Sequence, residues 1–224
     1  MNLGYACINM NLSTLPKSKR VTTNRSMIKK TFQEKGIAYA SELGLQNCQD
    51  LLTILQWNEA NGIKVYRLSS DMFPHKSNPK VEDYDFDFAK DLLKQIGEKS
   101  KQYNQRLTFH PGQFNVIGSP KEHCFRNSIV DLNYHANVID AMSCGKDSVM
   151  VIHGGGTYGD KDASKQRWAD NFGRLPEHVQ KRLVLENCEK SYSIVDCLRI
   201  SELTGIPLVF DTHHFECYKL LHTS

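Results

Sequence analysis

Residues 149–153 read Val-Met-Val-Ile-His, a short apolar run that ends in a residue able to bind a metal ion. Three other runs in the chain have the same form. The four runs occupy residues 107–109 before His110, 149–152 before His153, 183–185 before Glu186 and 208–210 before Asp211. Each is bounded by polar or turn-forming residues, and helix-like segments separate them, which is typical of a parallel β-sheet.

Metal-binding residue types therefore stand at equivalent positions on four successive predicted strands. In a βα-barrel the C-terminal ends of the strands converge on one mouth, so these side chains can meet despite their separation in the sequence. Two imidazoles and two carboxylates suit borderline divalent ions such as Zn²⁺ or Mn²⁺. One such residue alone is more often hydrogen-bonded than a ligand, but four in equivalent places favour a shared site. We expect a metal-dependent active site lined by His110, His153, Glu186 and Asp211.

The rest of the chain continues the alternation of strands and helices. Earlier strands are predicted at residues 3–8 and 64–68, and helices at 50–61, 86–103, 122–142 and 193–203. The resulting total of six strands falls short of the eight of a closed barrel. The sequence thus predicts an α/β fold, a TIM-type (β/α) barrel truncated after about six strands, as a single domain of residues 1–224 that lacks strands seven and eight. An open sheet with protected edge strands is the alternative.

Composition agrees with one domain, because 224 residues with 40% hydrophobic residues can bury one sizeable core. The net charge of +3 is too small to indicate a nucleic-acid-binding protein by itself, so any basic surface has to be local. The seven cysteines include no Cys-x-x-Cys pair, which argues against a thiolate zinc site and favours reduced thiols. No signal peptide or membrane-spanning run is recognisable. We expect a protein of the cytoplasm or nucleus that is not secreted and binds no membrane.

Residues 11–33 form a basic stretch without any acidic residue. Its cations are Lys17, Lys19, Arg20, Arg25, Lys29 and Lys30. One interpretation is a solvated loop followed by the start of a helix. The other follows from the barrel rule, because a segment after a strand begins on the active-site face, where clustered cations can hold phosphates. The sequence leaves both interpretations open.

Two stretches at predicted strand ends carry a specific resemblance: His-Pro-Gly-Gln-Phe at residues 110–114 and His-Gly-Gly-Gly-Thr-Tyr-Gly-Asp-Lys at 153–161. Shorter stretches at 4–9, 66–70, 185–187 and 211–214 add to it. Together they resemble the UV damage endonuclease family, DNA-repair enzymes of the xylose-isomerase-like TIM-barrel superfamily that are related to endonuclease IV. The matching stretches span nearly the whole chain in the family's order.

The resemblance implies an enzyme that cuts the DNA backbone immediately 5′ to a UV photoproduct. It also implies a cluster of roughly two or three divalent ions, with Mn²⁺ foremost and Zn²⁺ or Mg²⁺ as alternatives. The family's ligand pattern falls on His75, His110, His153, Glu186, Asp211 and His214. Among these, Glu186, His110 and Asp211 are the expected catalytic residues, and His75 is placed only by the loop that follows residues 66–70. The family's remaining ligands, a His pair and a Glu on strands seven and eight, have no counterpart in the 224 residues.

Cleavage beside a lesion requires the damaged bases to leave the stack, which is base flipping. The resemblance implies that Gln113 and Phe114 fill the gap that flipping leaves. Phe114 lacks the hydroxyl of the tyrosine often found in the family, so it offers stacking alone. A loop aromatic that packs on the rim is the alternative interpretation of Phe114.

Other DNA contacts are implied more weakly. Tyr5 and Asn9 match the rim of the family's lesion pocket, but a buried aromatic and a turn-capping amide explain them equally well. Lys161 follows a glycine-rich loop and is expected at a phosphate, with an exposed surface lysine as the alternative. The remaining expected DNA contacts are Lys17, Lys19 and Arg20.

The expected partner is double-stranded DNA that carries UV photoproducts, bound by a monomer. An abasic-site endonuclease of the same superfamily would use a similar metal cluster, but the Gln113–Phe114 pair favours the lesion-specific relative. A sugar isomerase of the same fold needs no basic loop, so residues 17–30 count against it. A truncated paralogue that binds damaged DNA without cutting it is the non-enzymatic alternative.

Overall fold

The computed structural model describes residues 2–222, and this part of the chain divides into two compact units. The first unit contains residues 2–110 and 137–148, and the second contains residues 111–136 and 149–222. Each unit is built on three parallel strands, so the described residues contain six strands, the number that the sequence predicts.

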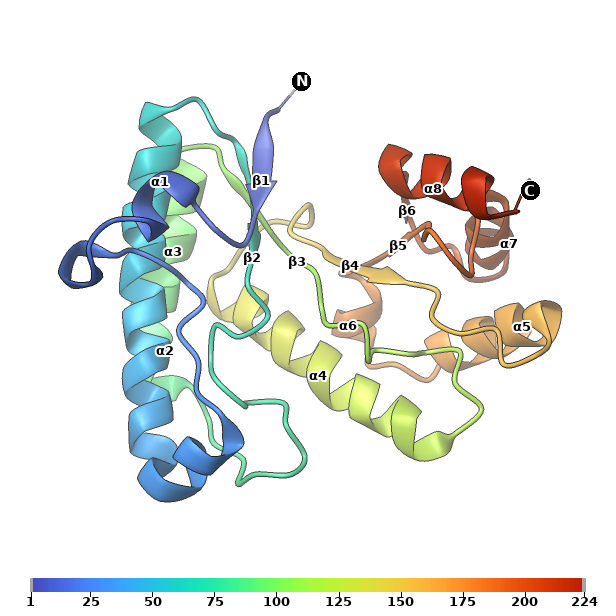
Figure 1. The fold of residues 1–224 in the computed structure, drawn as a ribbon, viewed down its shortest axis with the longest axis horizontal. Helices are drawn as coiled ribbons and strands as arrows, with labels where there is room; N and C mark the ends of the chain where they lie inside the picture. Colours follow the sequence, from blue (N-terminus) through green and yellow to red (C-terminus); the bar gives the residue numbers. More distant parts are fainter. Residues whose placement is uncertain (1, 223–224) are drawn as a thin grey trace. The chain divides into compact units, whose positions relative to one another are not determined.

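The strands of the first unit pair in parallel in chain order: β1 (Gly4–Ala6), β2 (Val65–Leu68) and β3 (Arg106–Phe109). Its two long helices, which lie side by side in Figure 1, are α2 (Lys29–Ala60) and α3 (Lys90–Gln102). Shorter elements lie in the connections: α1 (Met10–Ser13) and the 3₁₀ turns η1 (Lys17–Lys19) and η2 (Asp87–Ala89). Apolar side chains from helices and strands form the core, with Leu51, Ile54, Leu55, Leu68, Leu93 and Ile96 fully buried.

Helix α2 is much longer than the helix predicted at residues 50–61, so the predicted start is wrong. Gly36, with φ 67° and ψ −165°, interrupts α2 near its beginning. The stripe that α2 buries is partly polar, because Asn47, Asp50 and Asn58 are buried among its leucines and isoleucines. Each of these three side chains is hydrogen-bonded within the first unit. A buried stripe that contains satisfied polar groups hides the apolar periodicity from which a helix is predicted.

The strands of the second unit also pair in parallel in chain order: β4 (Met150–His153), β5 (Leu183–Glu186) and β6 (Leu208–Val209). Helix α4 (Glu122–Ala141) belongs to this unit as far as residue 136. The other helices are α5 (Lys161–Phe172), α6 (Glu177–Gln180), α7 (Ile194–Thr204) and α8 (Thr212–His222), all labelled in Figure 1. Trp168 stacks on Phe172 with ring centroids 5.6 Å apart, and both are buried.

Local signals explain where the elements begin and end. Helix α7 begins with a capping box, in which Ser193 and Asp196 exchange hydrogen bonds, and ends at Gly205, whose φ of 74° stops the helix. Strand β1 ends at Ala6 because Cys7 has a left-handed φ of 58°. The boundaries of all six predicted strands agree with the structure within one or two residues. The helix predicted at 86–103 begins later than expected, because η2 precedes it.

All seven cysteines lie in the described part of the chain and have free thiols. Among the residues described, no helix combines the length and the apolarity that crossing a membrane requires.

Candidate metal centre

The strand ends of the second unit bring two predicted ligands into direct contact. The parallel register pairs His153 at the end of β4 with Glu186 at the end of β5, so both side chains leave the same face of the sheet. The Nε2 atom of His153 lies 2.8 Å from Oε2 of Glu186. The Glu186 carboxylate is 2% exposed, so it needs such a partner, because a carboxylate is buried only when it is paired.

The start of helix α8 brings two more predicted ligands to this place. Asp211 precedes the helix and accepts a hydrogen bond from the backbone N–H of His214 through Oδ1 at 2.8 Å. One ligand atom from each of Glu186, Asp211 and His214 lies within 4.8 Å of the others. The rings of His153 and His214 meet edge to face with centroids 5.2 Å apart. Four of the six predicted ligands thus form one cluster in the second unit.

The tautomer of His214 follows from its hydrogen bond. Its Nδ1 lies 3.0 Å from the carbonyl oxygen of Asn187, and because a carbonyl only accepts, Nδ1 carries the proton. The lone pair is therefore on Nε2, the arrangement that a metal-binding histidine requires. Nε2 also lies 4.0 Å from Oε2 of Glu189.

Asn187 is a positioning residue that the sequence analysis did not single out. Its side-chain amide donates to the carbonyl of Asp211 at 2.9 Å, and its Oδ1 accepts from the N–H of Asp211 at 2.8 Å. The side chain thereby continues the hydrogen-bond ladder between the ends of β5 and β6. The backbone carbonyl of Asn187 also orients His214. The signal in the sequence is an amide directly after a strand-end carboxylate.

The donor set of the second unit fits a divalent cation. Two neutral imidazoles and two carboxylates leave a net charge that a divalent ion can balance, and this mixture suits Zn²⁺ or Mn²⁺. The residues that could hold it in this unit are His153, Glu186, Asp211 and His214.

The other two predicted ligands lie in the first unit. His110 directly follows β3 and is half-buried, and its backbone carbonyl accepts a hydrogen bond from Ser70 at 2.9 Å. Both ring nitrogens of His75 are engaged, since Nε2 donates to the carbonyl of Met27 at 2.8 Å and Nδ1 accepts from Asn78 at 3.0 Å. His75 can become a ligand only if one of these hydrogen bonds breaks. The assignment of both histidines to the metal stays a prediction.

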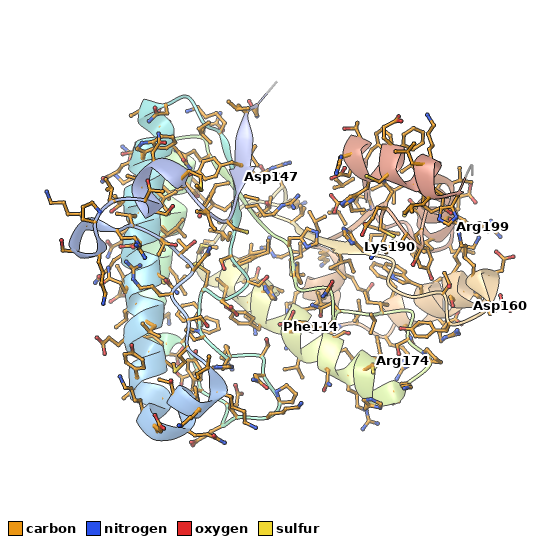
Figure 2. All side chains as sticks on the ribbon, in the orientation of Figure 1. Phe114, Asp147, Asp160, Arg174, Lys190 and Arg199 are labelled. Atoms are coloured by element: carbon orange, nitrogen blue, oxygen red, sulfur yellow. The ribbon has the colours of Figure 1, made fainter. Side chains whose placement is uncertain are left out.

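The turn at residues 112–115 presents Gln113 and Phe114 to solvent. The N–H of Asn115 donates to the carbonyl of Gly112 at 3.0 Å, which closes the turn, and Phe114 is 59% exposed (Figure 2). The buried side-chain amide of Asn115 holds the turn from below, because it donates to Gly112 at 2.9 Å and to Asp131 of α4 at 2.7 Å. The pair is exposed on an anchored turn, as a gap filler requires.

Tyr5 and Asn9 have structural roles in the first unit. The Tyr5 hydroxyl donates to Asn58 of α2 at 2.8 Å and accepts from Asn9 at 2.8 Å. Asn9 is buried and caps helix α1 by accepting from the N–H of Leu12 at 3.1 Å. Burial raises the pKa of Tyr5, so its hydroxyl remains protonated. Asn9 thus acts as the capping amide and Tyr5 is a half-buried, hydrogen-bonded aromatic, while contact of either residue with a lesion stays a prediction.

The basic stretch is not uniform. Lys17, Lys19 and Arg20 are exposed and form no ion pair with any residue of the described chain. Arg25 instead pairs with Asp50 of α2 at 2.5 Å and donates to the carbonyl of Thr22. Arg25 therefore fastens the loop to α2, whereas Lys17, Lys19 and Arg20 remain available to a phosphate.

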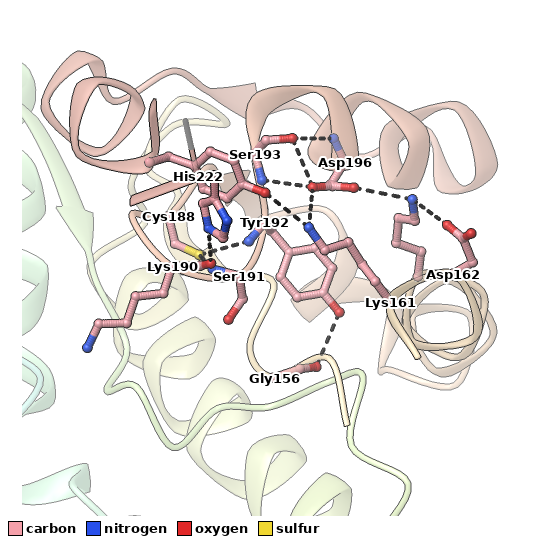
Figure 3. Close-up of polar contacts among 12 residues, drawn as sticks. Gly156, Lys161, Asp162, Cys188, Lys190, Ser191, Tyr192, Ser193, Asp196 and His222 are labelled. Carbon is pink, nitrogen blue, oxygen red and sulfur yellow. Dashed lines mark hydrogen bonds and ion pairs between the residues drawn. The ribbon is translucent and has the colours of Figure 1, made fainter. Parts of the chain in front are cut away.

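Lys161 is engaged in a network shown in Figure 3. Its ammonium donates to Asp196 of α7 at 3.2 Å and to the hydroxyl of Tyr218 of α8 at 3.1 Å. Lys165, one turn further along α5, donates to the other oxygen of Asp196 at 3.2 Å and pairs with Asp162 at 2.7 Å. The network joins α5, α7 and α8. A phosphate contact by Lys161 stays a prediction and would compete with these bonds.

The network shifts the pKa of its members. Burial pushes the pKa of Asp196 upward, but hydrogen bonds from Ser193, Lys161 and Lys165 bring it below the usual value. Burial pushes the pKa of Lys161 downward, but its bonds to Tyr218 and Asp196 raise it above the usual value. The pKa of Lys165 is raised, first by Asp162. Burial raises the pKa of the neighbouring Tyr192 to about 12.

The fold of the chain defines its class. The crystal structure of endonuclease IV from Thermus thermophilus matches with a TM-score of 0.52 at 14% identity, over 77% of this chain and 62% of that chain. This likeness confirms the predicted TIM-type (β/α) barrel class.

Sequence comparison gives the family. The profile of the family described as UV-endonuclease UvdE matches residues 1–223, and the chain belongs to this family. It is 41% identical to the putative UV-damage endonuclease of Acanthamoeba polyphaga mimivirus, over 96% of this chain and 65% of that protein. The crystal structure of SacUVDE matches with a TM-score of 0.86 at 34% identity, over 97% of this chain and 71% of that chain. The chain therefore spans less than two thirds of the length of its viral relative.

The ion pairs of Asp196 predict a pH dependence of stability. The pKa of Asp196 is lower in the folded chain than its usual 3.8. The ionised carboxylate therefore stabilises the fold above about pH 4, and this stabilisation is lost as the pH falls through the folded pKa. The stabilisation by the charged Lys161 and Lys165 is lost as the pH rises through the pKa values of these lysines, which lie above 10.5. We expect Asp196→Asn, which keeps an acceptor for Ser193, to lower the free energy of unfolding by about 1 kcal/mol near neutral pH and by much less near about pH 3. Urea unfolding at both values measures this.

Asp162→Asn is the matched control, because Asp162 also pairs with Lys165 but its side chain is 91% exposed. This variant should change little at either pH. If Asp196→Asn lowers the free energy of unfolding equally at both pH values, the cause is lost helix capping rather than lost charge.

Proposed function

We propose that the protein is a DNA-repair endonuclease that cuts the phosphodiester backbone 5′ to UV photoproducts in double-stranded DNA. The single observation that carries the proposal is the cluster of His153, Glu186, Asp211 and His214 at the strand ends of a chain that belongs to the UV-endonuclease UvdE family. The relative from Acanthamoeba polyphaga mimivirus is described as a putative UV-damage endonuclease, and the same activity is proposed for this chain.

The proposed cofactor is a group of divalent ions, Mn²⁺ foremost. When bound, such ions acidify a water molecule and neutralise charge on the phosphate undergoing attack. Glu186 carries the central role, since its buried carboxylate has two oxygens that can reach different ions. Asp211, just before α8, would supply a second negatively charged ligand. His214 would bind through Nε2, because the carbonyl of Asn187 holds the proton on Nδ1. His110 is added to the ligand set because it ends the apolar run at residues 107–109, and His75 is added on the family's pattern alone.

Recognition of the lesion is assigned to the turn at residues 112–115. Flipping of damaged bases leaves a gap in the duplex, and an aromatic wedge with an amide beside it can fill such a gap. The exposed Phe114 ring and the Gln113 amide have this character. The hydrogen bonds of Asn115 fix the turn before DNA binds, which lowers the entropy lost on binding.

The exposed cations Lys17, Lys19 and Arg20 are proposed to hold DNA phosphates. They follow β1 at its C-terminal end and have no acidic partner among residues 2–222, so binding phosphate costs no existing ion pair. Phosphate contacts position the duplex but do not report on the lesion. The preference for damaged DNA is therefore assigned to the turn at residues 112–115.

Glu186→Gln tests the catalytic proposal. The substitution keeps the shape of the side chain and removes its charge, so in the complete protein Mn²⁺ affinity should fall at least about tenfold and cleavage of UV-irradiated DNA by orders of magnitude. Calorimetric titration with Mn²⁺ measures binding independently of activity, and circular dichroism checks the fold. Glu202→Gln, on the exposed side of α7, is the control and should behave as the wild type does. Unchanged Mn²⁺ affinity in Glu186→Gln would show that Glu186 is not a ligand.

Replacing Lys17, Lys19 and Arg20 together by Ala tests the phosphate contacts. The variant should bind irradiated and undamaged duplex more weakly by the same factor, and each lost contact should reduce the slope of log affinity against log salt by roughly 0.9. Fluorescence anisotropy over a series of salt concentrations measures both quantities. Replacing the exposed lysines Lys90, Lys94 and Lys101 of α3 is the control for net charge. An unchanged salt slope in the first variant would support the solvated-loop interpretation.

A further inference from the structure

The loop between β4 and α5 carries an aromatic residue in an unusual backbone conformation. The N–H of Asp160 donates to the carbonyl of Thr157 at 3.1 Å, which closes a turn with Tyr158 and Gly159 at its centre. Their φ angles are 51° and 85°, so both central residues are left-handed, as in a type I′ turn. Glycine and asparagine favour this conformation, whereas a bulky aromatic residue is strained in it.

The surroundings hold Tyr158 in this conformation. Ser164 is fully buried and donates through its hydroxyl to the carbonyl of Thr157 at 2.6 Å. Asp160 caps helix α5 by accepting from the N–H of Ala163 at 3.0 Å. Residues that the surrounding structure holds in a strained conformation concentrate at functional sites. The strained backbone of Tyr158 therefore suggests that its ring has a function.

The ring of Tyr158 is supported on one side and exposed on the other. It is 46% exposed and packs over Gly156, where an added Cβ atom would lie 3.3 Å from the ring. The guanidinium of Arg167 lies 5.9 Å from the ring centroid. Arg167 is itself fixed by a hydrogen bond from Nε to the carbonyl of Gly118 at 3.2 Å. The ring is thus held in place with a positive charge beside it. Because it is already ordered, stacking on it would lose little conformational entropy.

This loop also packs against the segment that follows the turn at residues 112–115. A Cβ atom added to Gly155 would lie 3.3 Å from Cγ1 of Val116. Asn171 of α5 donates to the carbonyl of Ile117 at 2.7 Å. The second unit therefore presents two exposed aromatic rings, Phe114 and Tyr158, on two anchored loops that touch each other.

We propose that Tyr158 is a second stacking residue for DNA, which receives an unstacked nucleobase at the lesion. The proposal rests on the proposed function and adds a residue to its DNA-binding surface. In an intact duplex the faces of the bases are covered by their neighbours, so the ring finds a partner only when bases are flipped or left unpaired. Stacking on an aromatic ring tolerates every base, because each has a π-face. The ligand is therefore an unstacked base of any identity, and Arg167 supplies positive charge beside it.

The test compares Tyr158→Asn and Tyr158→Gly, which remove the ring and relieve the backbone strain, with Tyr158→Phe, which keeps the ring. The complete protein is titrated with UV-irradiated and undamaged duplex of the same sequence, and thermal unfolding is recorded for each variant. Both ring-less variants should unfold at the wild-type temperature or above it, yet bind irradiated duplex about tenfold more weakly and undamaged duplex as the wild type does. Tyr158→Phe should stay within about twofold of the wild type on both duplexes.

Several outcomes would overturn the inference. Wild-type affinity of a ring-less variant for irradiated duplex would show that the ring does not stack, and equal losses on both duplexes would make it a contact to the DNA backbone. A loss in Tyr158→Phe as large as in Tyr158→Asn would assign the effect to the hydroxyl. If the wild type itself shows no preference for irradiated duplex, the proposed function fails and this inference with it. If the wild type shows the preference and both ring-less variants keep it, the inference alone fails.

Discussion

The parallel register of β4, β5 and β6 is the constraint on which the candidate site depends. It aligns His153 with Glu186 and Glu186 with Val209, so that the strand ends stop at one edge and the chain enters α8 beside them. A slip of one residue would turn the carboxylate of Glu186 to the opposite face. Asn187 secures the register where the ladder ends, because its amide takes the place of a backbone pair opposite Asp211. Strand pairing, ligand placement and histidine tautomer are thus one connected arrangement.

Around this arrangement, the second unit keeps exposed side chains on loops that its buried polar residues hold in place. Asn115 and Asp131 support the turn that carries Phe114, and Ser164 supports the turn that carries Tyr158. The charges of Asp196 and its lysines connect α5 with α7 and α8 in the same unit (Figure 3). Rings and amides that are fixed before binding lose little entropy when they meet a ligand. This rigidity is consistent with recognition of distorted DNA, where the nucleic acid rather than the protein changes shape.

The sequence predicted the six strands well, because the apolar runs are short and have clear polar boundaries. The runs also put His153, Glu186 and Asp211 at strand ends, whereas His214 was added by the family resemblance, and the role of all four as ligands stays a prediction. The sequence prediction failed for residues 29–49 of α2, where Gly36 interrupts the helix and Asn47 is buried within the apolar stripe. Arg25 was indistinguishable from its cationic neighbours, since its partner Asp50 is distant in the sequence. Asn187 was missed for a similar reason, because its role depends on the start of α8. The roles of these residues depend on contacts between segments that are distant in the sequence, which a local sequence pattern does not reveal.

The most direct test of the proposed endonuclease is the position of the cut in a duplex that contains one UV photoproduct at a known place. The complete protein is incubated with end-labelled DNA in Mn²⁺ or with a chelator, and the products are resolved to single nucleotides. We expect a single nick immediately 5′ to the photoproduct, present with Mn²⁺ and absent with the chelator. The proposed function would be contradicted if the protein binds this duplex in Mn²⁺ but leaves it uncut, or if it nicks only a matched duplex with an abasic site.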